Sequence, residues 1–552
     1  MEAYFFEWNQ VMFWTACLSS LVVFWLIFAF VRRVGNTLNH ESLAEKGNLP
    51  INLRFEHLKD QWTFLMKKYK LSESTVPRWH FCVFDRFDLQ IFVGTWNMGN
   101  SVPPNCDVIR TWFACEAGGT GTSPNGSCAR LQHDVIIVGV QECAYYPEKQ
   151  SCENHWFNLL KKTLGSEFTM IACISLRKSI RTGVFVRKLW TPCIDAIQAD
   201  MHSTTFPVFW RKGGIGVHLK LLGTDLCFLN CHLSAHSSRT LTRNSELRRL
   251  FGRIKLGRRN CDISNQFHHI WVFGDLNYRV LTDWNHCDRL ISARDWQTLE
   301  SYDQLIQEQK KEKILYDFIE GPLNFSPTFK VARGSPDCYS SQRIPSWCDR
   351  ILVHSLPNCS LRTNNYARAK SIASSDHTPV YATFTCSIPP SRVLHQHRDY
   401  VKTHSHDEKS TDVPALRHAR PFRLIFTQLV LEMTEHACTD MYPEFRPAVA
   451  FASPVISGDC EATAATNADL FTYFWDSTIT LRTEPICAHL LAVSHLYIHI
   501  RDQSSAGASS ANVALAVLAL QTPFRSPQTF AAPAINCGVK FGTISGCFHI
   551  KC

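Results

Sequence analysis

Short apolar runs alternate with helical stretches between residues 79 and 388. The runs are rich in branched and aromatic residues, and their lengths are those of buried strands. They are Leu89–Val93, Val135–Val140, Gly183–Val186, Ile215–Leu219, Leu226–Leu229, Ile270–Phe273 and Val380–Phe384. The pattern therefore predicts one domain over residues 79–388 in which helices connect the strands of a β-sheet core.

The first apolar run of the chain has a different character. Residues 11–31 contain no charged side chain, and a helix of this length spans a bilayer core of about 30 Å. A cleaved signal peptide is the alternative, but Glu2 and Glu7 precede the run without any Lys or Arg, and no A-x-A-like site follows it. The run therefore predicts a transmembrane anchor. Arg32 and Arg33 follow it directly, which predicts that the rest of the chain faces the cytosol.

Three further segments differ from the central domain in composition. Residues 34–78 predict a juxtamembrane segment with one helical part, which either docks on the main domain or rests a basic face on anionic lipid. Residues 389–420 begin with Pro389-Pro390 and hold four histidines within residues 395–406; a flexible linker is favoured over a metal site. Strand-like runs separated by Ser, Gly and Pro turns predict an all-β sandwich over residues 421–552.

Composition narrows the functional classes only slightly. The formal charge of +9 over 552 residues is a mild excess. It favours anionic membranes or phosphorylated substrates, and it does not imply a nucleic-acid partner. The 23 cysteines include no C-x-x-C pair of the kind that zinc fingers use, and many lie in apolar runs. Buried free thiols in a reducing compartment are therefore expected.

Polar side chains stand where several predicted strands end, which is where a sheet-based enzyme places its site. Carboxylate and amide oxygens with few thiols favour Mg²⁺ or Mn²⁺ over zinc. There is no Gly-rich phosphate loop, so hydrolysis of a phosphate ester by a metal-activated water fits best. Each of these residues alone has an ordinary structural explanation, and only the set is informative. The set is Asn97, Glu142, His232, Asp275, Asn277, Asp376 and His377.

Two strings carry a closer resemblance. FGDLNYR at residues 273–279 and IPSWCDRIL at residues 344–352 closely resemble the two signature motifs of the inositol-polyphosphate 5-phosphatase family. Further matches follow in the order of that family: GTWNMG at 94–99, VQE at 140–142, NCHL at 230–233, an Arg-Asn pair at 243–244 and SDHTPV at 375–380. The resemblance implies the four-layered α/β sandwich of the endonuclease/exonuclease/phosphatase superfamily, with two packed mixed sheets.

The resemblance also implies roles for single residues. Glu142, assisted by Asn97, is similar to the magnesium site. Asp275 resembles the residue that orients and deprotonates the attacking water, which Asn277 positions beside the phosphate. His377 is similar to the histidine that stabilises the transferring phosphoryl group, with Asp349 as its orienting carboxylate. His232 and Asp376 would complete the ring around the phosphate.

The expected substrate-binding cations are Lys212, Arg279, Lys330, Arg343 and Arg350. Two positions depart from the family pattern, because Arg211 replaces an asparagine before Lys212, and Ser341 stands where many members have a lysine. These positions bear on recognition of the neighbouring ring phosphate. The reaction type is therefore better specified than the preferred inositide.

The C-terminal region weakly resembles a C2 domain, through its strand pattern and HLYIHIRD at residues 495–502. The aspartates there are scattered, so calcium-independent packing is favoured over calcium binding.

The leading hypothesis is a Mg²⁺-dependent 5-phosphatase whose partners are phosphoinositide lipids at the cytosolic membrane face, where an anchor raises the effective concentration. Soluble inositol polyphosphates are an alternative substrate, since the same pocket would accept the headgroup. A superfamily nuclease or sphingomyelinase is disfavoured by the PSWCDR string. A non-catalytic membrane adaptor is disfavoured because every core catalytic position is filled.

Overall fold

The computed structural model describes residues 87–114, 131–147, 151–204, 212–389, 422–433, 441–447, 463–467, 470–475, 478–483, 491–502, 511–520 and 527–551. The predicted membrane segment 11–31, the juxtamembrane segment 34–78 and all but the first residue of the predicted linker 389–420 lie outside this range, so these boundaries stay predictions. Within the described residues, no helix is both long and apolar enough to cross a membrane.

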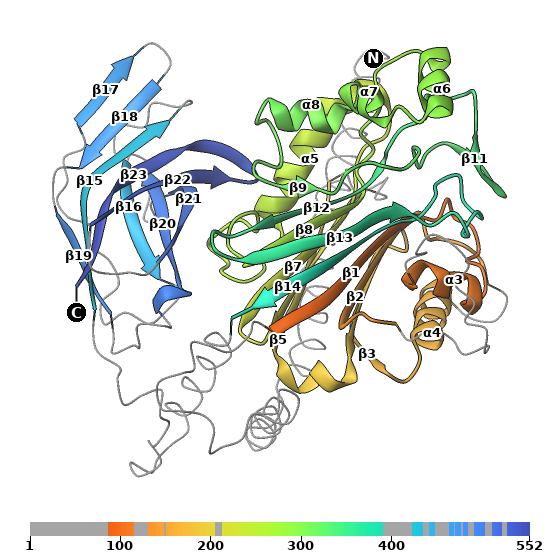
Figure 1. Cartoon of the computed structure of the whole chain (residues 1–552), viewed down its shortest axis with the longest axis horizontal. Helices are drawn as coiled ribbons and strands as arrows, with labels where there is room; N and C mark the ends of the chain where they lie inside the picture. The colour runs from red at the N-terminus through yellow and green to blue at the C-terminus, as the bar shows by residue number, and fades with distance from the viewer. Residues whose placement is uncertain are drawn as a thin grey trace, which may run out of the picture. The chain divides into compact units, whose positions relative to one another are not determined.

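Two six-stranded mixed sheets form the domain that contains residues 87–389 (Figure 1). The first has the strand order β13-β14-β1-β2-β4-β3, with β1 Phe87–Asn97, β2 Val135–Gln141, β3 Phe168–Leu176, β4 Ile180–Arg187, β13 Ser360–Arg368 and β14 Val380–Ile388. The second has the order β5-β6-β7-β8-β12-β9, with β5 Ile194–Ser203, β6 Gly213–Leu221, β7 Thr224–His232, β8 His269–Asp275, β9 Ile319–Glu320 and β12 Asp349–Ser355. A separate hairpin pairs β10 Val331–Ala332 with β11 Ser335–Tyr339.

The central strands read as unbroken apolar runs because both of their faces are buried. In β2, Val135 and Ile137 belong to the core between the two sheets, whereas Ile136 and Val138 belong to a second core on the outer face. Side chains on a strand point alternately to opposite faces, so one run fills two cores. The same alternation holds in β8, where Trp271 faces the inner core and the residues beside it face outward.

Helices cover the outer face of each sheet. On the first sheet they are α3 Cys106–Phe113 and α4 Cys152–Leu164. On the second sheet α5 Thr240–Arg253 and α8 Gln304–Lys310 contribute to the outer core. The remaining helices of the domain are α6 Trp284–Ala293 and α7 Trp296–Ser301. Helix, sheet, sheet and helix give the predicted four-layered α/β sandwich, which is confirmed.

Local signals fix where the helices begin. Asn105 caps α3 by accepting a hydrogen bond from the Val108 N–H, and Ser151 caps α4 by accepting one from the Asn154 N–H. Such caps satisfy backbone N–H groups that have no partner in the first turn of a helix. Asparagine and serine are residue types that commonly begin helices, so sequence and structure agree at the starts of α3 and α4.

The described part of the C-terminal region consists almost entirely of β-strands, as predicted, but these form a single curled sheet rather than the two facing sheets of the predicted sandwich. Its strands form one antiparallel sheet with the order β16-β20-β21-β22-β23-β15-β18-β17, and β19 pairs with β15. The strands are β15 Arg423–Met433, β16 Met441–Pro447, β17 Thr463–Asn467, β18 Leu470–Trp475, β19 Ile479–Arg482, β20 His495–Asp502, β21 Ala511–Ala519, β22 Gln528–Asn536 and β23 Val539–Lys551. Alternate residues of β15 and β20 meet in one apolar core, which is how a curled sheet buries one of its faces. The C2 resemblance stays a prediction.

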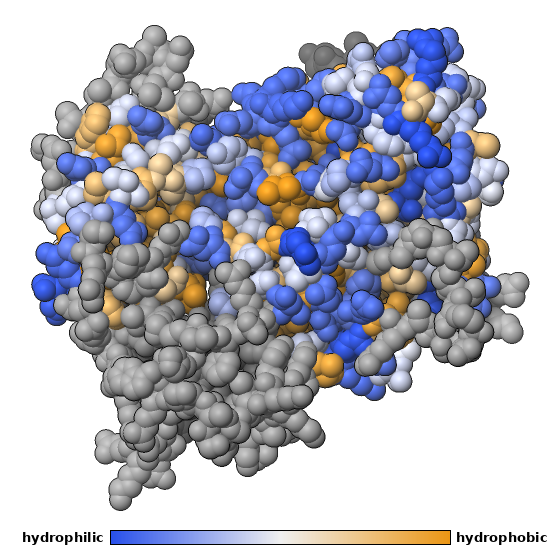
Figure 2. Space-filling model, viewed as in Figure 1, coloured by the Kyte–Doolittle hydropathy of each residue, from blue (hydrophilic) through white to orange (hydrophobic). Residues whose placement is uncertain are grey.

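On the face shown in Figure 2, hydrophilic side chains cover much of the described surface, with hydrophobic ones scattered among them. Scattered apolar side chains of this kind are ordinary on a folded domain. The polar strand ends described next are a more informative feature.

Candidate active site

The polar strand ends converge because of the way the strands pair. β1 runs parallel to β2, and β7 runs parallel to β8, so each pair delivers its last residues to the same edge of its sheet. Two antiparallel strands begin at that edge: β12 starts with Asp349 opposite Asp275, and β14 starts with Val380 opposite Thr95. Residues as far apart along the chain as Thr95 and Val380 therefore meet at one edge of the sandwich.

The turn after β8 explains the Gly-Asp-x-Asn spacing. Gly274 has a φ of +131°, and a Cβ added to it would lie 2.0 Å from the Cys231 carbonyl oxygen of the neighbouring strand. Only glycine fits there. Asn277 has a φ of +58°, a left-handed conformation that asparagine tolerates better than most residues. The motif is thus a tight reversal that turns Asp275 and Asn277 toward the site.

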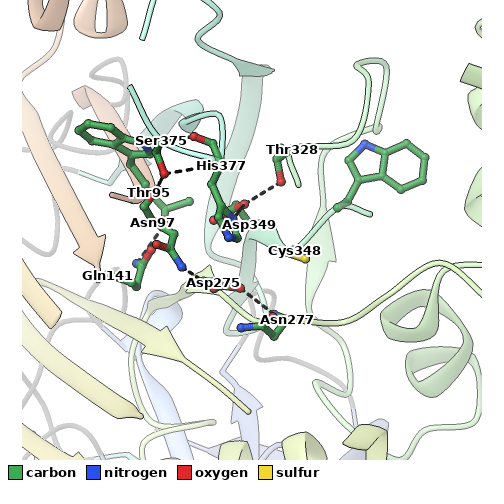
Figure 3. A network of polar contacts seen from close by, with 12 residues as sticks. Thr95, Asn97, Gln141, Asp275, Asn277, Thr328, Cys348, Asp349, Ser375 and His377 are labelled. Carbon is green, nitrogen blue, oxygen red and sulfur yellow. Dashed lines mark hydrogen bonds and ion pairs between the residues drawn. The ribbon is translucent and has the colours of Figure 1, made fainter. Parts of the chain in front are cut away.

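Asp275 is the centre of the site (Figure 3). Its Oδ2 accepts a hydrogen bond from Asn97 Nδ2 at 2.9 Å and lies 3.3 Å from His232 Nε2, and its Oδ1 accepts one from the Asn277 N–H at 3.1 Å. Burial alone would raise the pKa of Asp275, but the hydrogen bond from His232 and the charge of His377 outweigh burial and hold it below its usual value. The carboxylate is therefore ionised at neutral pH.

His377 has the opposite charge state. Its Nδ1 lies 2.9 Å from Asp349 Oδ2, and the same oxygen accepts a hydrogen bond from Thr328 Oγ1 at 2.7 Å, as Figure 3 shows. Burial alone would lower the pKa of His377, but the charge of Asp349 and the hydrogen bond to it raise the pKa to about 9. Because Asp349 occupies Nδ1, the Nε2–H of a protonated His377 is left for a substrate.

A second histidine stands on the other side of Asp275. His232 Nε2 contacts Lys212 Nζ and lies 3.7 Å from Glu142 Oε1. Burial, followed by the charge of Lys212, lowers the pKa of His232, and burial lowers the pKa of Lys212. His232 is therefore neutral at pH 7, whereas His377 is cationic. One site thus holds an ionised carboxylate between a neutral and a charged imidazole.

Glu142 and Asn97 fit a hard metal cation. Glu142 follows β2, its side chain is 39% exposed, and among the described residues its carboxylate accepts no hydrogen bond. Asn97 is the last residue of β1 and lies beside Glu142. The side chain of Asn97 is held by a hydrogen bond from the Gly99 N–H to its Oδ1, at 3.0 Å. A carboxylate without a hydrogen-bond donor is available to Mg²⁺, which binds oxygen ligands, and Asn97 Oδ1 keeps one lone pair beside it.

A second group also meets a distance criterion for metal binding: ligand atoms of Asp275, Asp349 and His377 all lie within 4.8 Å of one another. His377 already pairs with Asp349, and with a pKa of about 9 it carries a proton at neutral pH. Asp349 Oδ2 also accepts a hydrogen bond from Thr328 Oγ1, so this oxygen already has two protein partners. We therefore favour the pair Glu142 and Asn97.

The structure brings only some of the predicted substrate-binding cations to the site. Arg279 is 8% exposed; its guanidinium donates to Asn277 Oδ1 and lies over the Phe329 ring at 4.5 Å. Lys330 follows Phe329, whose ring lies 4.5 Å from that of His377. Arg343 is exposed on the segment after β11. Arg211 lies outside the described residues.

Arg350 is a correction to the predicted substrate-binding set. Its side chain is wholly buried, with Nε 2.8 Å and Nη2 2.5 Å from the carboxylate of Glu320 and Nη1 2.9 Å from Asp303 Oδ1. These carboxylates raise the pKa of Arg350, although burial opposes them. All three guanidinium nitrogens thus face buried partners, so Arg350 holds β12 to β9 and cannot reach a phosphate. A sequence motif shows that a residue is required, and does not show which way it points.

Asp376 lies at the rim of the site rather than in its centre. Its side chain is 26% exposed, and its Oδ1 lies 4.0 Å from Arg333 Nη2. Arg333 also donates to the Gly99 carbonyl oxygen at 2.9 Å. This arginine belongs to the segment between β10 and β11 and was missed from sequence, because nothing in its local pattern marks it.

Other residues of the site were also missed. Thr328 and Ser375 hold Asp349 and His377 in place, the latter by accepting a hydrogen bond from the His377 N–H at 3.2 Å. Gln141 and Asn230 join the two sheets beneath the site, at 2.7 Å from Nε2 to Oδ1. Both lie at strand ends next to predicted residues, and that position was the only signal available for them.

The comparisons with known proteins agree with this geometry. The profile of the Endonuclease/Exonuclease/phosphatase family 2 matches residues 94–383, which is more than half of the chain. The chain belongs to this family, and the family resemblance of its motifs is confirmed.

Among curated proteins, phosphatidylinositol 3,4,5-trisphosphate 5-phosphatase 2B of Danio rerio is 33% identical over 317 residues, covering 54% of this chain and 25% of the relative. The human phosphatidylinositol 3,4,5-trisphosphate 5-phosphatase 2 is 32% identical, covering 54% of this chain and 24% of the relative. This chain thus spans about a quarter of the length of these relatives.

Among solved structures, one that aligns with this chain is the inositol polyphosphate 5-phosphatase domain of SPsynaptojanin, in complex with inositol (1,4)-bisphosphate and calcium. The TM-score is 0.47 at 21% identity, and the alignment covers 64% of this chain and 99% of that domain.

Proposed function

We propose that this protein is a magnesium-dependent phosphatase that removes the 5-phosphate from phosphoinositides. The observation that carries the proposal is that Asp275 meets the His377–Asp349 ion pair at one edge of the sandwich, with atoms of the three side chains within 4.8 Å of one another. Asp275 is ionised there and His377 is protonated. A base that accepts the proton of water and a cation that faces the phosphoryl oxygens are the two groups that hydrolysis of a phosphate ester requires. The curated relatives named above support the inositide as substrate.

Each residue of the site has its own role in the proposed reaction. Asp275 accepts a proton from the attacking water, Asn277 holds that water, and a new P–O bond forms as the bond to the ring oxygen breaks. His377 Nε2–H donates a hydrogen bond to the phosphoryl oxygens, on which negative charge is concentrated. Neutral His232 uses its Nε2, 3.3 Å from Asp275 Oδ2, to orient that carboxylate. Glu142 and Asn97 would hold Mg²⁺, which supplies charge neutralisation when it is bound. The departing ring oxygen takes a proton from solvent, and Asp275 returns its proton to solvent. The net reaction consumes one water and gives inorganic phosphate and an inositide with a free 5-hydroxyl group.

The cations near the site support a substrate with more than one phosphate. Lys212 is partly buried against His232. Lys330 follows Phe329 directly before the β10–β11 hairpin, and the exposed Arg343 follows the hairpin. Phosphatidylinositol (4,5)-bisphosphate and (3,4,5)-trisphosphate are the proposed substrates. Soluble inositol polyphosphates present the same headgroup, and a direct comparison of lipid and headgroup separates the two.

Removal of the metal provides the test of the reaction. The full chain, freed of metal with EDTA, should release no phosphate from PtdIns(4,5)P2 vesicles, and Mg²⁺ should restore release. Glu142→Ala should raise the Mg²⁺ concentration for half-maximal rate by at least about tenfold, because a ligand is lost. Ser101→Ala, at the neighbouring loop, serves as the control. Full activity in EDTA would refute metal dependence.

We further propose that residues 11–31 anchor the chain in a membrane with the phosphatase on the cytosolic side. The support is the uncharged run followed by Arg32-Arg33, together with a proposed lipid substrate. In sealed microsomes the phosphatase domain should be digested by added protease. The chain should also stay in the pellet after carbonate extraction. A protease-protected domain would reverse the orientation, and release by carbonate would refute the anchor.

A further inference from the structure

Helix α5 holds a buried carboxylate beneath the segment that follows His232. Glu246 is 6% exposed. Its Oε2 accepts a hydrogen bond from the Ser234 N–H at 2.8 Å, and its Oε1 accepts one from Ser234 Oγ at 2.6 Å. Both oxygens of one side chain thus bind one residue. This arrangement fixes the backbone immediately after His232 in a single position.

The same helix also holds the segment that follows Asp275. Two residues before Glu246, Asn244 Oδ1 accepts a hydrogen bond from Tyr278 Oη at 2.7 Å, and Asn244 Nδ2 donates to Glu308 Oε2 of α8 at 2.8 Å. Tyr278 is wholly buried, and the guanidinium of Arg243 lies 4.9 Å from the centre of its ring. The residue next to Asn277 is therefore tied to α5 by a hydrogen bond and by stacking.

The two tied segments are joined to each other inside the site. The Leu233 N–H donates to the Asp275 carbonyl oxygen at 3.0 Å, and Asn277 Nδ2 donates to the Leu233 carbonyl oxygen at 3.1 Å. Leu233 lies between His232 and Ser234. A displacement of Ser234 would therefore be passed to Asn277, and a displacement of Tyr278 would be passed to the backbone of Leu233.

We propose that Glu246 and Asn244 are positioning residues, which set the placement of Asn277 and His232 around Asp275 from the buried part of α5. This inference rests on the proposed function and deepens it. The two residues touch no substrate atom, since both are buried beneath the loops that they hold. A displacement of about 1 Å at reacting groups can lower a rate about 100-fold, so the loss of either contact should act on turnover more than on binding.

Two conservative variants test the proposal, Glu246→Gln and Tyr278→Phe. Glutamine keeps the shape but has one acceptor oxygen in place of two, and phenylalanine removes only the hydroxyl that binds Asn244. Each should lower kcat about 10- to 100-fold with KM within about threefold of wild type. The double variant should fall by less than the product of the two single effects, because both contacts position the same pair of loops. Ser245→Ala is the matched control, since Ser245 lies between Asn244 and Glu246 but is exposed.

Amide hydrogen exchange of the full chain gives a readout that does not depend on activity. In both variants, exchange should rise in peptides that cover residues 233–236 and 277–279 while the strands of the two sheets stay protected. Unchanged exchange in these segments would overturn the proposal, as would an equal loss of protection throughout the domain. An active wild type whose variants keep wild-type kcat would also overturn it. An inactive wild type with the predicted change in exchange would refute the proposed function alone.

Discussion

Replacement of Asp275 by asparagine is expected to lower kcat for phosphate release by about a thousandfold or more. In the proposed reaction Asp275 accepts the proton of the attacking water, and an amide cannot accept it. The change keeps the size of the side chain, and an amide oxygen in the place of Asp275 Oδ2 can still face Asn97 Nδ2 and His232 Nε2. The amide nitrogen would then face the Asn277 N–H. The fold and the affinity for substrate vesicles should therefore be retained.

The measurement is kcat and KM of the full chain on PtdIns(4,5)P2 vesicles, with vesicle sedimentation as the binding assay and thermal unfolding as the check on folding. Asp283→Asn is a matched control, because the same chemical change occurs eight residues away. Asp283 caps α6 by accepting a hydrogen bond from the His286 N–H, and asparagine caps helices equally well. Turnover by Asp275→Asn within tenfold of wild type would show that another group activates the water.

At alkaline pH, loss of the proton from His377 should limit the rate of the reaction. Its pKa is raised to about 9, so the imidazole is protonated at neutral pH and loses its proton as the pH rises through that value. Because the protonated form faces the phosphoryl oxygens, kcat/KM should hold at neutral pH and fall above about pH 9. Asp275 stays ionised throughout, since its pKa lies below its usual value.

Asp349→Asn should move this alkaline limit to lower pH. The charge of Asp349 counters the effect of burial on His377, and without that charge burial should dominate and lower the pKa of His377. The activity at pH 7 should fall as well, on the order of 100-fold. Profiles of kcat/KM against pH for wild type and Asp349→Asn measure the shift, with the exposed Asp337→Asn as the control. An alkaline limit that stays in place in Asp349→Asn would show that His377 is not the titrating group.

Sequence reasoning located the chemistry because the residues involved stand at the ends of strands. Asp275 and Asn277 follow an apolar run, and a positive φ at Gly274 and Asn277 explains why their motif is so short. The four-layered architecture came from the family resemblance, and the double burial of β2 and β8 accounts for it physically. The Gly-Asp-x-Asn motif and the apolar runs of β2 and β8 each lie within a short stretch of sequence, which is why they could be recognised there.

The contacts between distant segments could not be predicted in this way. Arg350 lies in a conspicuous motif, yet its partners Asp303 and Glu320 come from segments with no pattern that marks them. Thr328, which binds Asp349, is likewise fixed by the path of a loop. The orientation of such side chains depends on which strands pair, and the pairing of distant strands could not be predicted from this one sequence.

The identity of the product tests the proposed function most directly. The full chain with Mg²⁺ should be presented with PtdIns(3,4,5)P3, PtdIns(4,5)P2 and soluble Ins(1,4,5)P3, and the products should be separated by the position of the lost phosphate. The proposal predicts PtdIns(3,4)P2 from the first lipid and PtdIns(4)P from the second, with Asp275→Asn producing neither. Loss of a 3- or 4-phosphate, or no phosphate release by a folded, Mg²⁺-supplied protein, would contradict it.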